Sequence, residues 1–266
     1  MGRPGAMLVQ SQPTHDGITD SDLKSWYLDK HIPEVLDTGG VRGVLFCQLD
    51  RESSKEYLGE QVPKLYLAVY LLHDLAWLHE EGCGLWRLPL VLSSNNVDLE
   101  ARHRGRSVFE VAEFVTHFWE VVEAAAHNGM VAQPMAGPPD DDKTKEEPTM
   151  RLVLSYLDSP DKSRTNLADL MPAPAHDQEP EAIISTLFKV DETNPGPPAS
   201  KNEKGDTPVP LPEQKYLHCH QLFGNTLHES PLPPHGFRLS TVEYTVLAEF
   251  GDTKPLRSGN ETSVQA

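Results

Sequence analysis

Two apolar segments decide the predicted fold. Residues 64–72 read KLYLAVYLL, and residues 214–222 read QKYLHCHQL. In a gapless alignment three positions are identical, namely Tyr66/Tyr216, Leu67/Leu217 and Leu72/Leu222. Similar segments, LFCQLD at 45–50 and LFKVD at 187–191, precede the two. A shared register between segments this far apart in the chain indicates an internal repeat.

Each half contains further strand-like and helix-like segments. In the first half we predict strands at 6–9, 41–49 and 65–72, a helix that starts at the capping-box-like sequence TDSD (19–22) and ends at Gly39-Gly40, and a second helix from Asp74. The closing segment 108–122 is rich in Val, Phe and Trp and favours a strand. A helix stays the alternative there, because Glu110, Glu113, Glu120 and Glu123 could line one helix face.

The second half follows the same order with weaker helices. It opens with a strand-like segment at 151–157 and closes with another at 237–250, and its first helix is reduced to 166–170. The order β-α-β-β-α-β is that of the ferredoxin-like unit. The sequence therefore predicts an α+β fold, in which two ferredoxin-like βαββαβ repeats form a single-chain dimeric α+β barrel. Pairing the two open sheet faces would cover both of them.

Composition shifts divide the chain into four parts. We predict a first repeat at 6–123, an acidic Pro/Gly linker at 124–149, a second and degenerate repeat at 150–251, and a flexible tail at 252–266. The pseudo-dimer would be a monomeric chain, and the sequence leaves a further homodimer open.

The charge balance limits the partners. The chain carries 23 Lys+Arg against 40 Asp+Glu, a formal net charge of −17. This excess of acid disfavours nucleic acids and anionic membranes as partners. The chain has no run of about 18 apolar residues and no signal-like start, so we expect a cytoplasmic protein whose partner is a small molecule. Its three cysteines form no metal-binding pattern, and we expect free thiols.

Strand alternation suggests an aromatic-lined pocket. It separates the aliphatic face of 65–71 from Tyr66 and Tyr70. We expect the aliphatic face to lie under the helices and the tyrosines to point into the barrel, and the same register turns Tyr216, His218 and His220 inward. His117, in the closing segment, is a further candidate. The alternative is a filled barrel in which these side chains satisfy one another.

Two histidines on one strand face also raise the question of a metal site. His218 and His220 have no third ligand at suitable spacing, so no metal is predicted. The chain contains none of the motifs GxGxxG, P-loop, G-x-S-x-G and HExxH, and no cofactor is predicted.

Residues 26–33, WYLDKHIP, together with 66–70, YLAVY, resemble the EthD-like group of dimeric α+β barrel proteins through a W-x4-H-x-P helix signature. The resemblance covers about 6–122 well and 150–251 weakly. It implies a small cofactor-free enzyme of the kind frequent in fungal natural-product pathways. It also implies His31 as general acid/base, whereas the alternative is a histidine that holds the helix end. Trp26 is a candidate for the pocket wall or simply for the core.

The resulting hypothesis is a cofactor-independent enzyme of secondary, polyketide-like metabolism that uses acid/base chemistry in a barrel pocket, such as a cyclase, decarboxylase or dehydratase. His31 would be catalytic. The substrate-binding residues would be Trp26, Tyr66, Tyr70, His117, Tyr216, His218 and His220. A barrel interior packed solid with side chains would contradict this hypothesis. The alternatives are a non-catalytic barrel that binds a small molecule or a partner, and a cofactor-free oxygenase.

Overall fold

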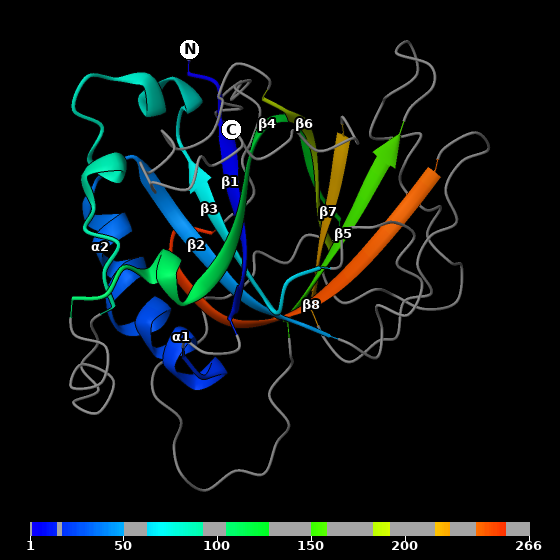
Figure 1. Cartoon of the computed structure of the whole chain (residues 1–266). Coiled ribbons are helices and arrows are strands. Elements are labelled where there is room, and N and C mark those ends of the chain that lie inside the picture. The colour runs from blue at the N-terminus through cyan, green and yellow to red at the C-terminus, as the bar shows by residue number, and fades with distance from the viewer. Residues whose placement is uncertain are drawn as a thin grey trace, which may run out of the picture.

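Eight strands form a closed antiparallel barrel (Figure 1). The computed structural model describes residues 2–14, 18–50, 63–92, 105–127, 150–158, 183–191, 216–223 and 238–253. The strands are β1 (Gly5–Pro13), β2 (Val41–Leu49), β3 (Tyr66–Leu72), β4 (Ala112–His127), β5 (Met150–Asp158), β6 (Ile183–Val190), β7 (Tyr216–Phe223) and β8 (Arg238–Gly251). Their order around the barrel is β1-β3-β2-β8-β5-β7-β6-β4.

The two halves of the chain contribute their strands in the same relative order. Within the first half the neighbours run β4-β1-β3-β2, and within the second half they run β8-β5-β7-β6. The halves meet at two seams, β2 with β8 and β6 with β4. The strand arrangement therefore repeats along the chain.

Two long strands close the barrel. β4 pairs with β1 through Ala112–Glu120 and then with β6 through Trp119–His127. β8 pairs with β5 through Arg238–Thr245 and then with β2 through Tyr244–Gly251. Each of the two strands thus extends beyond the strands of its own half. Its second part forms backbone hydrogen bonds with a strand of the other half.

The predicted α+β class is wrong. Among the described residues, α-helix is limited to one continuous segment of the first half, made of α1 (Asp20–Trp26), the π-helical turn η1 (Tyr27–His31) and α2 (Ile32–Asp37). The remaining helical pieces are short 3-10 turns, η2 (Leu75–His79), η3 (Gly84–Arg87) and η4 (Val108–Glu110). The second helix predicted from Asp74 ends after five residues, and none of the described residues of the second half is helical. In its described residues the protein is a closed β-barrel with one helical segment, not a pair of ferredoxin-like α+β units.

Several local predictions are confirmed. Thr19 and Asp22 form a capping box at the start of α1. The helical segment ends at Asp37, and Gly39 adopts the left-handed conformation (φ 80°) expected after a helix end. β2 has the predicted bounds. The alternative of a helix at 108–122 is wrong, since a 3-10 turn there leads into β4. The predicted helix at 166–170 and most of the linker and tail lie outside the described residues.

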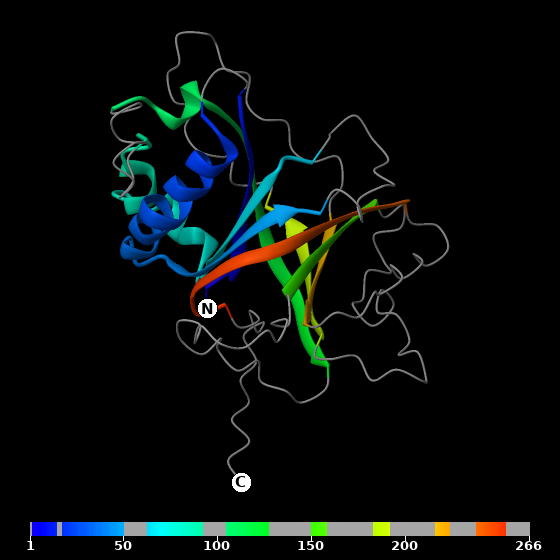
Figure 2. The ribbon, with the colours of Figure 1, turned by 90° about the horizontal axis from the view of Figure 1, so that it is seen from below.

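Two hydrophobic clusters lie on opposite faces of the sheet. The interior cluster takes buried residues from all eight strands, among them Leu8, Leu45, Leu154 and Leu217. It therefore lies inside the barrel, toward which strands of both halves turn one face. The outer cluster takes residues from the helical segment and from the outer face of β1–β4. Figure 2 shows the helical segment lying against these strands. No helix in the described ranges is long and apolar enough to cross a membrane.

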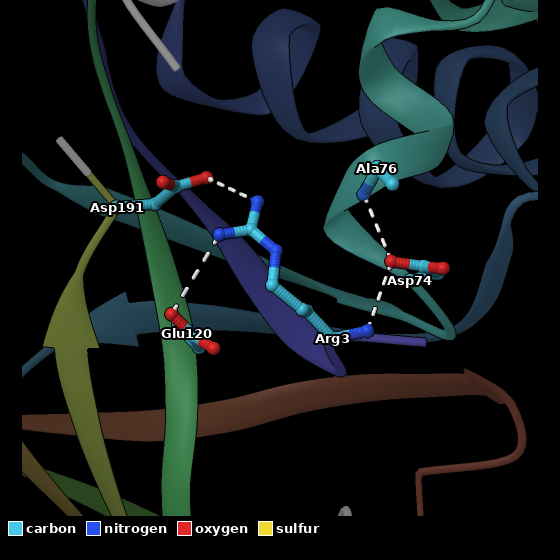
Figure 3. A network of polar contacts seen from close by, with 5 residues as sticks. All are labelled: Arg3, Asp74, Ala76, Glu120 and Asp191. Carbon is cyan, nitrogen blue, oxygen red and sulfur yellow. Dashed lines mark hydrogen bonds and ion pairs between the residues drawn. The ribbon is translucent and has the colours of Figure 1, made fainter. Parts of the chain in front are cut away.

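A polar network fastens the N-terminus to the β4–β6 seam (Figure 3). The backbone amides of Arg3 and Ala76 both donate to Asp74 Oδ1, each at 2.9 Å. These two donors lower the pKa of the Asp74 carboxyl. The Arg3 guanidinium lies 3.8 Å from the Glu120 carboxylate of β4 and 3.6 Å from Asp191, which follows β6. The Asp191 side chain is only 2% exposed.

We predict that Arg3→Met lowers the free energy of unfolding by about 1–2 kcal/mol. The substitution keeps the Arg3 backbone bond to Asp74 but removes the cation that faces the buried Asp191 carboxylate. Urea unfolding measures the effect. Lys30→Met, which removes the more exposed Lys30–Glu34 pair, is the control and should cost at most about 0.5 kcal/mol. Equal losses for the two variants would show that the Arg3 network adds nothing at the seam.

Candidate active site

The candidate site lies in the outer cluster, beneath the helical segment. Trp26 and Tyr27 come from this segment and are 2% and 0% exposed. Tyr66 and Tyr70 come from the outer face of β3 and are 2% and 0% exposed. His31 is the last residue of the π-helical turn inside the same helical segment and is half-buried. The site is therefore an aromatic cluster with one titratable side chain at its edge.

The local sequence explains the π-helical turn that presents His31. Pro33 has no N–H, so it cannot make the usual bond to the carbonyl four residues earlier. The Ile32 amide instead donates to the carbonyl of Tyr27, five residues back, which widens the turn over Tyr27–His31. Such single π turns inside α-helices are frequent at functional sites. The W-x4-H-x-P pattern thus encodes both the residue and its irregular backbone.

The His31 ring is surrounded by aromatic rings. It stacks on Trp26 with centroids 4.4 Å apart and planes 9° from parallel. Tyr27 and Tyr70 approach it edge-on, with centroid distances of 5.7 Å and 6.1 Å. Burial disfavours the charged imidazolium and lowers the pKa of His31 to about 4. The imidazole is therefore neutral at pH 7.

The hydroxyls of the cluster differ in their partners. Tyr27 donates to Ser11 Oγ at 3.0 Å, and Tyr66 donates to the backbone carbonyl of Asp20 at 3.1 Å. The Tyr70 hydroxyl is buried and has no hydrogen-bond partner among the described residues. Burial raises the pKa values of Tyr27 and Tyr70, and burial together with Asp20 raises the pKa of Tyr66 to about 12. All three phenols are thus protonated donors.

The predicted direction of the β3 side chains is wrong. Leu67, Val69 and Leu71 belong to the interior cluster, whereas Tyr66 and Tyr70 lie outside, under the helical segment. The Tyr66 ring packs on Phe46 and its hydroxyl donates to the Asp20 carbonyl, while the Tyr70 ring meets His31 edge-on. Compact aliphatic side chains suit the narrow interior better. A substrate pocket inside the barrel stays a prediction, but the tyrosines of β3 do not line the interior.

The candidates of the second half are not brought to His31. Leu217 and Cys219 lie in the interior cluster, contrary to the predicted orientation of β7. Tyr216 is half-buried at the start of β7, where its backbone pairs with Lys189 of β6. The backbones of His218 and His220 lie in β7, but their side chains are outside the described part of the structure.

His117 is also remote from the outer cluster. It is half-buried, pairs with Leu8 of β1, and lies two residues before Trp119 of the interior cluster. Strand alternation therefore places it on the inner face of β4. Of the predicted residues, the structure brings together His31, Trp26 and Tyr70, with Tyr66 at one flank.

Sequence reasoning missed Tyr27, Ser11 and Phe46. The signal for Tyr27 was its position four residues before His31, on the same helix face. Phe46 packs between the Tyr27 and Tyr66 rings at centroid distances of 4.8 Å and 5.3 Å. Nothing in the sequence marks Ser11, since its role depends on the pairing of β1 beneath the helix.

No metal centre emerges in the described ranges, where no three His, Cys, Asp or Glu side chains group together. Cys47, Cys83 and Cys219 are buried free thiols. The arrangement therefore offers protonated phenols, one hydroxyl and a neutral imidazole. These groups suffice for proton transfer and hydrogen bonding.

These features define a closed antiparallel β-barrel with a histidine-centred aromatic site on its outer face. No family model and no curated protein matches the chain. A solved structure described as an anthrone oxidase-like protein matches 97% of this chain and 97% of its own length, with a TM-score of 0.47 and 10% sequence identity. We assign neither family nor activity from a likeness of this size. The resemblance to the EthD-like group stays a prediction from two motifs.

We predict opposite stability effects for two tyrosine variants. Tyr70→Phe should leave the free energy of unfolding unchanged or raise it by up to about 1 kcal/mol, because it removes a buried hydroxyl without a partner in the described residues. Tyr27→Phe should lower it by about 1 kcal/mol, since it breaks the bond to Ser11. Chemical denaturation of both variants tests this. A clear loss in Tyr70→Phe would reveal a partner for that hydroxyl.

The pKa of His31 also predicts a pH dependence. The folded value of about 4 lies below the ordinary 6.5, so the unfolded chain binds the additional proton between these values. The stabilisation from neutral His31 is present above pH 6.5 and is lost as pH falls toward 4. We expect this loss to be about 1–2 kcal/mol, reduced by the partial solvent access of the ring.

The measurement is the unfolding free energy from pH 7 to 4 for wild type, His31→Gln and the exposed control His79→Gln. His31→Gln should flatten the pH dependence, whereas His79→Gln should keep it. Parallel curves for all three proteins would contradict a depressed His31 pKa.

Proposed function

We propose that the protein is a cofactor-independent enzyme that performs acid/base chemistry on an aromatic or polyketide-like small molecule, with His31 as the proton-transfer group. The observation that carries the proposal is the neutral, half-buried imidazole of His31, held by a π-helical turn against Trp26 and beside Tyr70. The proposed site is the outer cluster and not the barrel interior.

The chemistry follows from the protonation states. A neutral imidazole can accept a proton from an activated C–H or O–H of the substrate. The imidazolium that results is a strong acid in this desolvated position, because its pKa is about 4, and it returns the proton readily. Proton removal and return at neighbouring atoms is what enolisation, dehydration or aldol-type ring closure requires.

The aromatic surroundings support the substrate class. A flat phenolic or polyketide-like ring would stack where Trp26 now covers His31, or beside it. A substrate oxygen would accept a hydrogen bond from the Tyr70 hydroxyl, which has no partner among the described residues. Since Tyr70 is 0% exposed, binding requires the rings around His31 to move apart. Secondary metabolism is proposed from the motif resemblance, and the cytoplasm from the three free cysteines.

The experiment is comparative metabolite profiling in a strain that lacks its own copy of the gene. Strains complemented with wild type, His31→Gln or the exposed control His79→Gln are compared by mass spectrometry, with protein abundance checked by immunoblot. We expect His31→Gln to lose one product at least a hundredfold and to accumulate its precursor, since general acid/base groups contribute about 10²–10⁴ in rate. His79→Gln should match wild type.

Two outcomes contradict the proposal. Unchanged products in His31→Gln at normal abundance would make His31 structural and would favour a non-catalytic binding barrel. Product formation that stops without oxygen would instead favour an oxygenase. The mass difference between precursor and product separates cyclisation, dehydration and decarboxylation directly.

A further inference from the structure

One hydroxyl of the outer cluster differs from the polar groups around it. The Trp26 indole N–H donates to the carbonyl of Val91 at 3.0 Å, and the Tyr27 hydroxyl donates to Ser11 Oγ at 3.0 Å. The Tyr70 hydroxyl is buried and has no hydrogen-bond partner among the described residues. A buried hydroxyl without a partner is costly, so a ligand atom that accepts its hydrogen would gain a full hydrogen bond.

This hydroxyl belongs to a ring that touches the proton-transfer group. The Tyr70 and His31 rings meet at 77° with their centroids 6.1 Å apart. Tyr27 meets the same imidazole edge-on at 5.7 Å, and its proximity contributes to the raised pKa of Tyr70. A ligand oxygen that accepts the Tyr70 hydrogen therefore brings the carbon atoms next to it close to the imidazole.

The same surroundings disfavour a charged ligand. His31 is half-buried, and the Trp and Tyr rings that contact it are at most 2% exposed. Burial lowers the pKa of His31 to about 4. The cation next to it in the sequence, Lys30, is 44% exposed and lies 2.9 Å from Glu34. An anionic ligand would lose its hydration here without meeting that cation.

We propose that this site selects an uncharged carbonyl compound that carries a removable hydrogen on the carbon next to the carbonyl. The inference rests on the proposed function at His31 and narrows its substrate class. The carbonyl oxygen accepts the hydrogen bond of Tyr70, and the adjacent C–H faces His31. Carboxylate substrates are disfavoured, so enolisation, dehydration and aldol-type ring closure suit the site better than decarboxylation.

The proton transfer keeps the site neutral overall. His31 takes the proton, the electron pair of the broken C–H bond forms a C=C bond, and the carbonyl π pair moves to the oxygen. The resulting enolate oxygen is held by the Tyr70 hydroxyl. Enolate and imidazolium arise together and balance each other, and return of the proton restores both groups. A carboxylate on the substrate would add a second negative charge with only one cation to face it.

The test is calorimetric titration of the full chain at neutral pH with 2-acetylnaphthalene, 2-naphthoate and 2-ethylnaphthalene. The three share a flat ring system that can stack on indole or imidazole. The first carries an uncharged carbonyl, the second a carboxylate and the third no oxygen. We expect the ketone to bind at least tenfold more tightly than the carboxylate. Tyr70→Phe should weaken ketone binding about fivefold and leave binding of the hydrocarbon unchanged.

Tyr216→Phe is the matched control, because it removes a phenol hydroxyl at the start of β7, away from His31. It should bind all three ligands like wild type. Thermal unfolding checks that each variant is folded. Absence of ketone binding, equal binding of the carboxylate, or unchanged ketone affinity in Tyr70→Phe would overturn the proposal.

A second readout separates this proposal from the catalytic one. In D₂O, NMR follows deuterium exchange of the methyl hydrogens next to the carbonyl of 2-acetylnaphthalene. We expect wild type to accelerate the exchange, and His31→Gln to lose it while still binding the ketone. Tyr70-dependent binding without any His31-dependent exchange would contradict the proton-transfer role of His31 and would leave the selection of uncharged carbonyl ligands supported.

Discussion

The extra length of β4 and β8 is the constraint on which the rest of the structure depends. Each strand pairs with its own half through its first part and with the other half through its second part. Because backbone amides and carbonyls at a sheet edge need partners, a four-stranded half on its own would leave two edges open. The crossed pairing removes both edges and makes the two halves a single closed sheet.

Closure of the barrel separates an interior from an outer face. The interior cluster takes residues such as Leu45, Leu154 and Leu217 from strands of both halves. The candidate site lies on the outer face. There the helical segment covers β1–β4 and brings Trp26 and His31 over Tyr70.

The sequence predicted what is encoded locally. The strand at 41–49 is encoded by its run of mostly apolar residues, and the capping box at Thr19 by single side chains. Both are confirmed. The predicted orientation of the β3 side chains was wrong, because strand alternation separates two faces but does not tell which face lies inside the barrel. That choice depends on partners distant in the chain, such as Trp26 under the helix and Leu217 across the barrel. The role of Ser11 depends on the same tertiary contacts.

The described residues hold one histidine-centred aromatic cluster although the strands repeat. All four tryptophans precede residue 120, and the W-x4-H-x-P pattern occurs once, at 26–33. Burial lowers the pKa of His31, whose ring stacks on Trp26 at the end of the π turn that precedes Pro33. The aligned position of Tyr70 in the second half is His220, which is not a phenol. The repeated strands thus close the barrel, while the candidate site depends on the helical segment of the first half.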